Sequence, residues 1–389
     1  MVRIRPQVIV DAKFTEHTSY TINLELPKSG KLSTLFLKVA AKTTTTGNCP
    51  SPWMKYLISS ISVNQGGQSS LCAAPPEVFQ ADYYYKTGMM PQFGYQRPGG
   101  DGAIVDEIIP IMFGEKINDP ELYIDLAKLT DPKLSVTYNL GETDHSGQTV
   151  WNTEYYPRFT VLTNLFQGPG LPPAKGFESI RTTESYAPAN SEKRKIQLKG
   201  TMPITRLYAQ ADTLDADEEW LHLVDKYKLW GQNEEWIPFE LEAWQYTELI
   251  RHIYGICKAE AYIAYAKGGQ QIDMIIDRMI GASVHLPLSA TEMAKLKGAA
   301  GRMAELESIT MSSGSATTTV NQVEYNFQGL LPWSIAPIDM PKMLGIDTLD
   351  PTVKAPVYLQ LNHAVNAGDY TSLMKIHTQD ILTQGSIPV

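Results

Sequence analysis

The most constraining feature of this sequence is that one order of predicted elements occurs twice along its 389 residues. Each copy opens with two segments in which apolar and polar residues alternate, the pattern of half-buried strands. A tryptophan-led strand, a short helical segment, a proline in an apolar stretch, an Asp-Pro pair and a further alternating strand follow in each copy. The landmarks are 20–26, 32–41, Trp53, 76–85, Pro110, Asp131 and 134–140, and then 195–198, 204–211, Trp220, 239–254, Pro332, Asp350 and 356–362.

The two copies are unequal in length. The offset between them rises from 167 residues at Trp53 and Trp220 to 222 at Pro110 and Pro332, so the second copy carries 55 additional residues, which we place at 257–320. Within this insertion we predict a hairpin from 261–265 and 272–276, joined by a glycine pair. The capping-box pattern that starts at Ser289 predicts a helix up to Leu306. Long excursions of this kind are usually functional or interfacial.

A segment rich in proline and glycine, 167–176, suits neither helix nor strand and separates the two copies. A chain of this length exceeds what one core usually supports, so two domains are expected. We predict these parts in order: an N-terminal arm 1–13, a first domain 14–166, a linker 167–190, a second domain 191–378 with the insertion 257–320, and a C-terminal tail 379–389.

Composition favours an all-β fold with a few short helices. Only 19% of residues are charged, while the chain contains 28 Gly, 25 Pro and 20 Tyr, which indicates many turns and aromatic strands. The formal net charge of -9 argues against a surface that neutralises nucleic-acid phosphates, because such surfaces need clustered Lys and Arg. We therefore predict no direct, sequence-specific nucleic-acid binding.

The three cysteines, Cys49, Cys72 and Cys257, form no disulfide framework and no C-x-x-C pair. The N-terminus has no apolar run of signal-peptide length, and no stretch of about 18 apolar residues occurs in the chain. These features predict a soluble chain with reduced thiols, made in the cytosol.

The sequence predicts no catalytic, cofactor-binding or metal site, and no cofactor. His252 and Cys257 are the nearest pair of metal-ligating residues, but packing or solvent exposure explains them better. The acidic cluster at 212–219 lacks the glycine and the final glutamate of a calcium loop, and the glycines at 99–102 do not open a helix after a strand. Paired carboxylates from distant strands keep a carbohydrate-active enzyme as an alternative. The rings that could stack on sugars are Trp53, Tyr83, Tyr84, Trp220, Trp230, Trp236 and Trp244.

With its two β-sandwiches, the chain resembles the double jelly-roll major capsid proteins of tailless, membrane-containing bacteriophages and archaeal viruses, to which adenovirus hexon is a larger relative. The resemblance covers nearly the whole chain and is strongest at 108–114, 122–126, 131–134 and 61–67. It implies two consecutive eight-stranded jelly rolls. It also implies a short helix between the sixth and seventh strand of each roll, at 122–129 and 340–349.

The resemblance further implies a structural protein, not an enzyme, whose homotrimers form pseudo-hexameric capsomers of an icosahedral virion. Its implied partners are other copies of itself, neighbouring capsomers and penton or minor capsid proteins. An internal lipid membrane is a further implied partner, approached by the N-terminal arm with Arg3, Arg5 and Lys13. The insertion would decorate the outer end of the second roll or clasp a neighbouring subunit. A β-sandwich that binds or cleaves carbohydrate, and a trimeric viral spike or receptor-binding protein, are the alternative functions.

Overall fold

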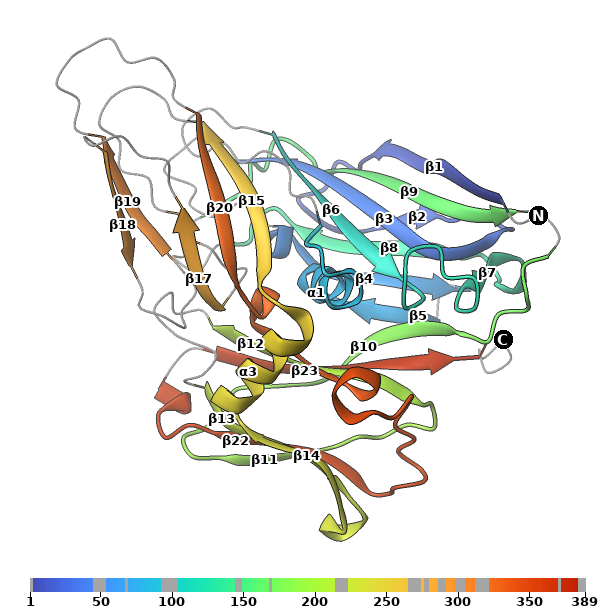
Figure 1. Ribbon diagram of the computed structural model, residues 1–389. Coiled ribbons are helices and arrows are strands. Elements are labelled where there is room, and N and C mark those ends of the chain that lie inside the picture. The colour runs from blue at the N-terminus through green and yellow to red at the C-terminus, as the bar shows by residue number, and fades with distance from the viewer. Residues whose placement is uncertain are drawn as a thin grey trace.

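The computed structural model consists of three stacked β-sheet layers with helices at their edges (Figure 1). The backbone is described without side chains for the strands between 257 and 329. The described residues are 3–44, 54–66, 69–91, 104–143, 149–167, 170–213, 223–264, 274–275, 280–285, 292–297, 305–311, 322–369 and 372–383.

The first layer is a sheet in which the four main strands run in the order β1-β9-β3-β6. The short strand β7 (Ile124–Asp125) extends this sheet by pairing with β3. The four main strands are β1 (Arg3–Lys13), β9 (Arg158–Gln167), β3 (Lys31–Lys42) and β6 (Ile104–Met112). Because β1 pairs with β9 from residue 3 onward, most of the segment predicted as an N-terminal arm is an edge strand of the first roll.

The middle layer is an eight-stranded sheet that belongs to both halves of the chain. Its first four strands face the first layer and complete the first roll: β2 (Ser19–Glu25), β8 (Lys133–Asn139), β4 (Ile58–Gln65) and β5 (Ser69–Ala74). Its other four begin the second roll: β10 (Phe177–Tyr186), β23 (Ser372–Leu382), β12 (Ile204–Thr213) and β21 (Ile335–Asp339). A parallel contact of Arg181 with Ala73 joins the two halves.

The third layer, in the order β11-β22-β13-β14, completes the second roll. Its strands are β11 (Lys193–Gln197), β22 (Val357–His363), β13 (Val224–Gly231) and β14 (Trp236–Glu242). Apart from the short β7, each strand of the first roll has a counterpart in the second, in the same sheet position and chain order. The predicted pair of eight-stranded rolls is therefore confirmed. Strand β10 lies inside the segment predicted as a linker, and β23 extends beyond residue 378.

Each roll encloses an apolar core of its own. The alternation that predicted the strands is visible in β22, where every second residue from Val357 to His363 is buried. Residues such as Leu37, Val136 and Val161 fill the first core, and Leu207, Leu229 and Leu359 fill the second. The phenol of Tyr208 belongs to the first core although its strand, β12, belongs to the second roll. The two cores are thus in contact through the middle sheet.

The helical segment predicted at 76–85 is confirmed, and the one predicted at 239–254 is helical from 243, because 239–242 belong to β14. The two helices occupy equivalent positions. Helix α1 (Pro76–Thr87) follows β5, and helix α3 (Ala243–Tyr254) follows β14. Pro76 is suited to the first turn, and Gly88, at a φ of 74°, ends α1 by donating its N–H to the carbonyl of Tyr84. A reciprocal capping box between Glu242 and Gln245 starts α3. Among the described residues no helix has the length and apolar character that a bilayer crossing requires.

Short helical turns complete the two rolls. The turns η2 (Leu126–Lys128) and η5 (Met340–Leu344) lie between the sixth and seventh main strands of each roll, as predicted. These strands are β6 and β8 in the first roll and β21 and β22 in the second. The remaining turns are η1 (Met54–Tyr56), η3 (Gln232–Glu234), η4 (Pro332–Ser334) and η6 (Ala367–Asp369).

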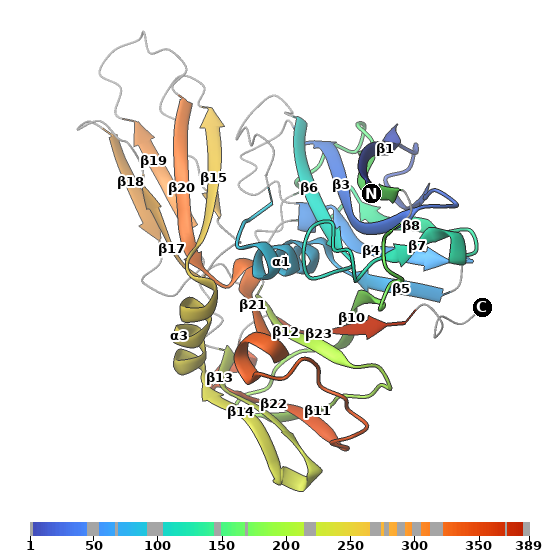
Figure 2. The ribbon, with the colours of Figure 1, turned by 45° about the vertical axis from the view of Figure 1, so that its right-hand side comes forward.

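The insertion is built from strands, which project beside α1 and α3 (Figure 2). The predicted hairpin is wrong because the first of its strands pairs with the far end of the insertion. The predicted helix is wrong because its described residues, 292–297 and 305–306, lie in two antiparallel strands. Pairing with distant strands outweighs the local helix signals. The strands are β15 (Cys257–Ala264), β16 (Met274–Ile275), β17 (Ile280–His285), β18 (Glu292–Lys297), β19 (Glu305–Met311) and β20 (Gln322–Leu330).

The register of the sheets corrects one landmark of the repeat. Pro110 lies opposite Phe36 of β3, and the proline in the equivalent place, opposite Tyr208 of β12, is Pro337. Pro332 instead lies in the turn η4. The offset at this point is 227 residues, so the second copy carries 60 additional residues, not 55. Pro332 and Pro337 both follow an apolar residue. Only strand pairing identifies Pro337 as the counterpart of Pro110.

Candidate functional site

Helix α1 connects the two rolls. It lies on the face of strands β10, β23, β12 and β21 that points away from the second core (Figures 1 and 2). Toward the first roll, the Gln80 amide donates to Glu107 at 2.5 Å. Toward the second roll, Glu77 accepts a hydrogen bond from Gln210 at 3.1 Å. These polar side chains are buried, so α1 is the interior of an interface and not a solvated helix.

Arg206 of β12 is at the centre of this junction. Its guanidinium contacts Asp339 at 2.7 Å and Glu115 at 2.6 Å, and it lies 3.8 Å from Glu178. Only 2% of the Arg206 side chain is exposed, so its charge is neutralised by partners and not by water. Glu115 follows β6 of the first roll, whereas the other three residues belong to the second roll. The contacts of Arg206 therefore cross between the rolls.

Lys86, at the end of α1, is the second buried cation. Its ammonium group lies 2.8 Å from Asp82, one helical turn earlier, and 2.6 Å from Glu178 of β10. The Tyr208 hydroxyl donates to Asp82 at 2.7 Å. The Gln379 amide donates to Asp82 and Glu178 at 3.1 and 3.3 Å. We call the set Asp82, Lys86, Glu115, Glu178, Arg206, Tyr208, Asp339 and Gln379 the roll junction.

The electrostatics of the roll junction are governed by burial and by its two cations. Burial raises the pKa of Glu178 to about 8, although Lys86 opposes this shift. For Glu115, the attraction of Arg206 and Lys86 outweighs burial and lowers the pKa to about 2. Burial disfavours the charge of Lys86, but Asp82 and Glu178 raise its pKa overall. Lys86 and Arg206 thus remain charged at neutral pH, and Glu178 is the group that takes up a proton.

Aromatic side chains extend the junction to α3. The Tyr85 hydroxyl donates to the Ile335 carbonyl at 2.6 Å, and its ring packs against Tyr208 and Tyr254 with centroid distances of 6.2 and 4.8 Å. The Tyr254 hydroxyl, at the end of α3, donates to Asp339 at 2.8 Å. Both helices and β21 are therefore held around one buried cluster. This arrangement can fix the orientation of the rolls.

The raised pKa of Glu178 predicts a pH dependence of stability. Its ordinary value is 4.5, so its contribution is complete below about pH 4.5 and is lost as pH rises to about 8. Between about pH 6.5 and 8, urea denaturation should show the free energy of unfolding falling by up to about 1.4 kcal/mol per pH unit in the native protein. In Glu178→Gln this slope should disappear.

The matched control is Glu184→Gln, because Glu184 pairs with Arg194 near the surface at 2.8 Å. This control should keep the native slope. Buried His377, whose pKa burial lowers to about 3, and His363, whose pKa burial also lowers, act in the opposite direction, mostly below about pH 7. Burial also raises the pKa of Asp380 to about 6, but that contribution ends below the tested range. An equal slope in the native protein and in Glu178→Gln would contradict this assignment.

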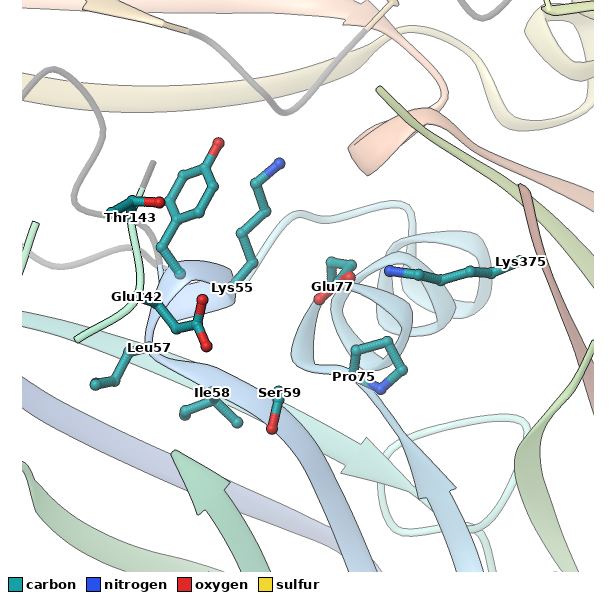
Figure 3. A pocket seen from close by; sticks show the side chains of 10 residues that line it. Lys55, Leu57, Ile58, Ser59, Pro75, Glu77, Glu142, Thr143 and Lys375 are labelled. Atoms are coloured by element: carbon teal, nitrogen blue, oxygen red, sulfur yellow. The ribbon is translucent and has the colours of Figure 1, made fainter. Parts of the chain in front are cut away.

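A pocket of about 320 Å³ lies beside the first turn of α1 (Figure 3). Lys55 and Glu142 line one side, and Glu77 and Lys375 line the other. The Lys375 side chain points toward Glu77. Tyr56 is the single aromatic residue in its lining. Two lysines and two glutamates give this pocket no strong charge of either sign.

The structure does not assemble the weighed candidate residues into a site. His252 is exposed on α3, and the Cys257 side chain lies outside the described residues, as do 214–219 of the acidic cluster and the glycines at 99–102. Within the described part of the chain, no group of three His, Cys, Asp or Glu side chains could hold a metal ion. Of the rings considered for sugar stacking, Tyr84 and Trp230 are buried, Trp244 is exposed on α3, and Trp53 and Trp220 lie outside the described residues.

No protein-family model and no curated protein matches the sequence. Solved structures, however, match almost its full length. The chain is similar to the major capsid protein of Sulfolobus turreted icosahedral virus, with a TM-score of 0.61 and 9% identity over 100% of this chain and 99% of that chain. It is also similar to the capsid protein of the virus PBCV-1, with a TM-score of 0.56 and 10% identity over 98% and 93% of the two chains. The major capsid protein of bacteriophage PM2 gives 0.50 and 8%, over 98% of each chain. The chain has the double jelly-roll fold.

The residues that join the two halves of this double jelly roll were missed by sequence reasoning. Arg206 and Lys86 look like ordinary strand and helix charges, and their partners are up to 173 residues away. One local signal was available: Asp82 and Lys86 are four residues apart, the spacing of a helical ion pair. That spacing is common on exposed helices as well. It therefore did not distinguish a buried junction from a solvated surface.

Proposed function

We propose that this chain is a major capsid protein, a structural protein of an icosahedral virion shell that is made in the host cytoplasm. The observation that supports this most directly is the fusion of two complete jelly rolls by one continuous eight-stranded sheet and a buried ionic junction. Such a chain is a rigid tile with two similar halves. The similar solved structures are viral capsid proteins, which agrees with this use of the fold.

In the proposed assembly, three copies form a homotrimer with six rolls around its axis. A duplicated domain in a threefold ring produces a nearly six-sided outline without six identical chains. Neighbouring capsomers and penton or minor capsid proteins are the further proposed partners. The insertion, whose strands project beside α1 and α3, is proposed to form the outer decoration of the second roll. An internal membrane has less support as a partner, because β1 is paired with β9 and is not a free arm.

The mass of the purified protein in solution tests this proposal. We expect a trimer of three times 43.3 kDa, measured by light scattering after size exclusion, with a six-sided outline in electron micrographs. Particles from the source should contain this chain as the abundant threefold tile, which would separate a capsid protein from a spike. A stable monomer that binds or cleaves glycans would contradict the proposal and favour the carbohydrate alternative.

A further inference from the structure

The duplication relates two sheet faces, each of which points away from the core of its own roll. In the second roll, Thr182, His377, Tyr208 and Pro337 form a row across β10, β23, β12 and β21. In the first roll, the corresponding row across β1, β9, β3 and β6 is Val8, Leu162, Phe36 and Pro110. Helix α1 covers the row in the second roll by hydrogen bonding and stacking with Tyr208. No described helix covers the row in the first roll, whose sheet is an outer layer (Figures 1 and 2).

The uncovered face carries a row of apolar side chains beside an ion pair of Lys38 and Asp106. Val8 is 53% exposed, and Ile104, on the same face of β6, is 54% exposed. Phe36 and Leu162 are half-buried and are absent from both cores. Isolated apolar side chains at a surface are ordinary, but a row across neighbouring strands is a contiguous patch of the kind found at interfaces. We call this surface the outer face of the first roll.

Helix α3 stands in the second roll where α1 stands in the first, at an offset of 167 residues. Glu77, which contacts Gln210, therefore corresponds to Trp244, and Asp82, which contacts Tyr208, corresponds to Leu249. Trp244 is 65% exposed. Where α1 presents polar groups to a polar row, α3 presents Trp244 and the half-buried Leu249, which also packs against the second core, and the equivalent row is apolar. The apolar side chains of α3 therefore suit the apolar row on the outer face of the first roll.

Charge adds a second complementarity. Strand β1 carries three basic residues and one acidic residue, whereas 232–250 contains five glutamates and no lysine or arginine. Lys226 and Lys228 of β13 pair with Glu234, Glu240 and Glu242, and Arg251 pairs with Glu248 at 3.8 Å. Five glutamates against three cations leave an acidic excess of two charges. Strands β1 and β14 are also edges of their sheets. Their counterparts, β10 and β5, meet in parallel inside the chain.

We infer that, in the trimer, helix α3 and strand β14 of one copy cover the outer face of the first roll of the next copy. This inference rests on the proposed capsid function and specifies its subunit interface. Between copies, α3 and β14 would make the contacts that α1 and β5 make within one chain. Trp244 would lie near Lys38, and Leu249 near Phe36. It joins two different surfaces, so it is a head-to-tail interface, which closes into a ring when the rotation fits.

Cysteine cross-linking in the assembled protein tests this interface. Lys38 of β3 is equivalent to Gln210 by register, so Trp244→Cys and Lys38→Cys should bring two thiols together between copies. Under mild oxidation, the double variant should run as covalent dimers and trimers on a non-reducing gel. Each single variant is the control for the three native cysteines and should remain at the mass of one chain.

A second measurement separates this interface from the capsid proposal itself. Trp244→Glu and Phe36→Glu should each reduce the mass in solution from trimer to monomer, because each places a charge in the proposed interface. Both side chains lie outside the cores, so the fold of each copy should stay intact. Val353→Glu, at a site that is 65% exposed, should leave the trimer intact. A native trimer that neither cross-links in the double variant nor dissociates in the glutamate variants would overturn the interface and leave the capsid function standing. A native protein that is monomeric would overturn the capsid function as well.

Discussion

Arg206→Met is expected to lower the free energy of unfolding by about 3–5 kcal/mol, because it leaves buried carboxylates without their cation. Methionine keeps most of the volume of the arginine stem, so the loss should be electrostatic and not a packing defect. Asp339 would keep its hydrogen bonds from Tyr254 and from the backbone of Lys342, whereas Glu115 would lose its ion pair with the second roll. Urea denaturation at one fixed protein concentration measures the change.

Arg194→Met is the matched control, because Arg194 is also a strand residue with two glutamate partners, Glu184 and Glu192. Its side chain is 37% exposed, and surface ion pairs of this kind contribute about 0–1 kcal/mol. A loss in Arg206→Met that is no larger than in Arg194→Met would show that the roll junction does not hold the rolls together.

The architecture could be predicted from the sequence because alternating apolar and polar residues mark the strands locally. Alternation in β22 and in β2 reflects sheets with one face on a core, and the repeat of element order required the same fold twice. The two helices were predictable for the same reason, since each follows a strand at the same place in its copy. The strands and helices within each roll could therefore be predicted.

The relation between the rolls could not be predicted, because it depends on contacts that have no local pattern. Asp82 and Gln379 are hydrogen-bonded across 297 residues of sequence. The polar residues of α1 are those of a solvated helix, and contacts with β6, β10 and β12 bury them. The helix predicted in the insertion was wrong for a related reason. Residues 292–297 have helix-forming neighbours but pair with β19. Tertiary pairing decided both cases against the local signal.

Lys86→Met should cost about 3 kcal/mol of stability at about pH 9, because it leaves Asp82 and Glu178 buried as neighbouring carboxylates. The cost should be smaller at about pH 6, where Glu178, with a pKa raised to about 8 by burial, already holds a proton and needs its cation less. The free energy of unfolding of the native protein and the variant, measured by urea denaturation at both pH values, gives this difference.

The double variant Lys86→Met/Glu178→Gln separates the two roles of the lysine. Removing the carboxylate that titrates should recover part of the loss at high pH and abolish its pH dependence, because Asp82 alone keeps its bonds from Tyr208 and Gln379. Lys226→Met, which breaks a pair at the surface with Glu240, should cost less than about 1 kcal/mol at either pH. An equal loss for Lys86→Met at both pH values would mean that Glu178 stays ionised beside Lys86, and that the junction is held by charge pairs throughout the neutral range.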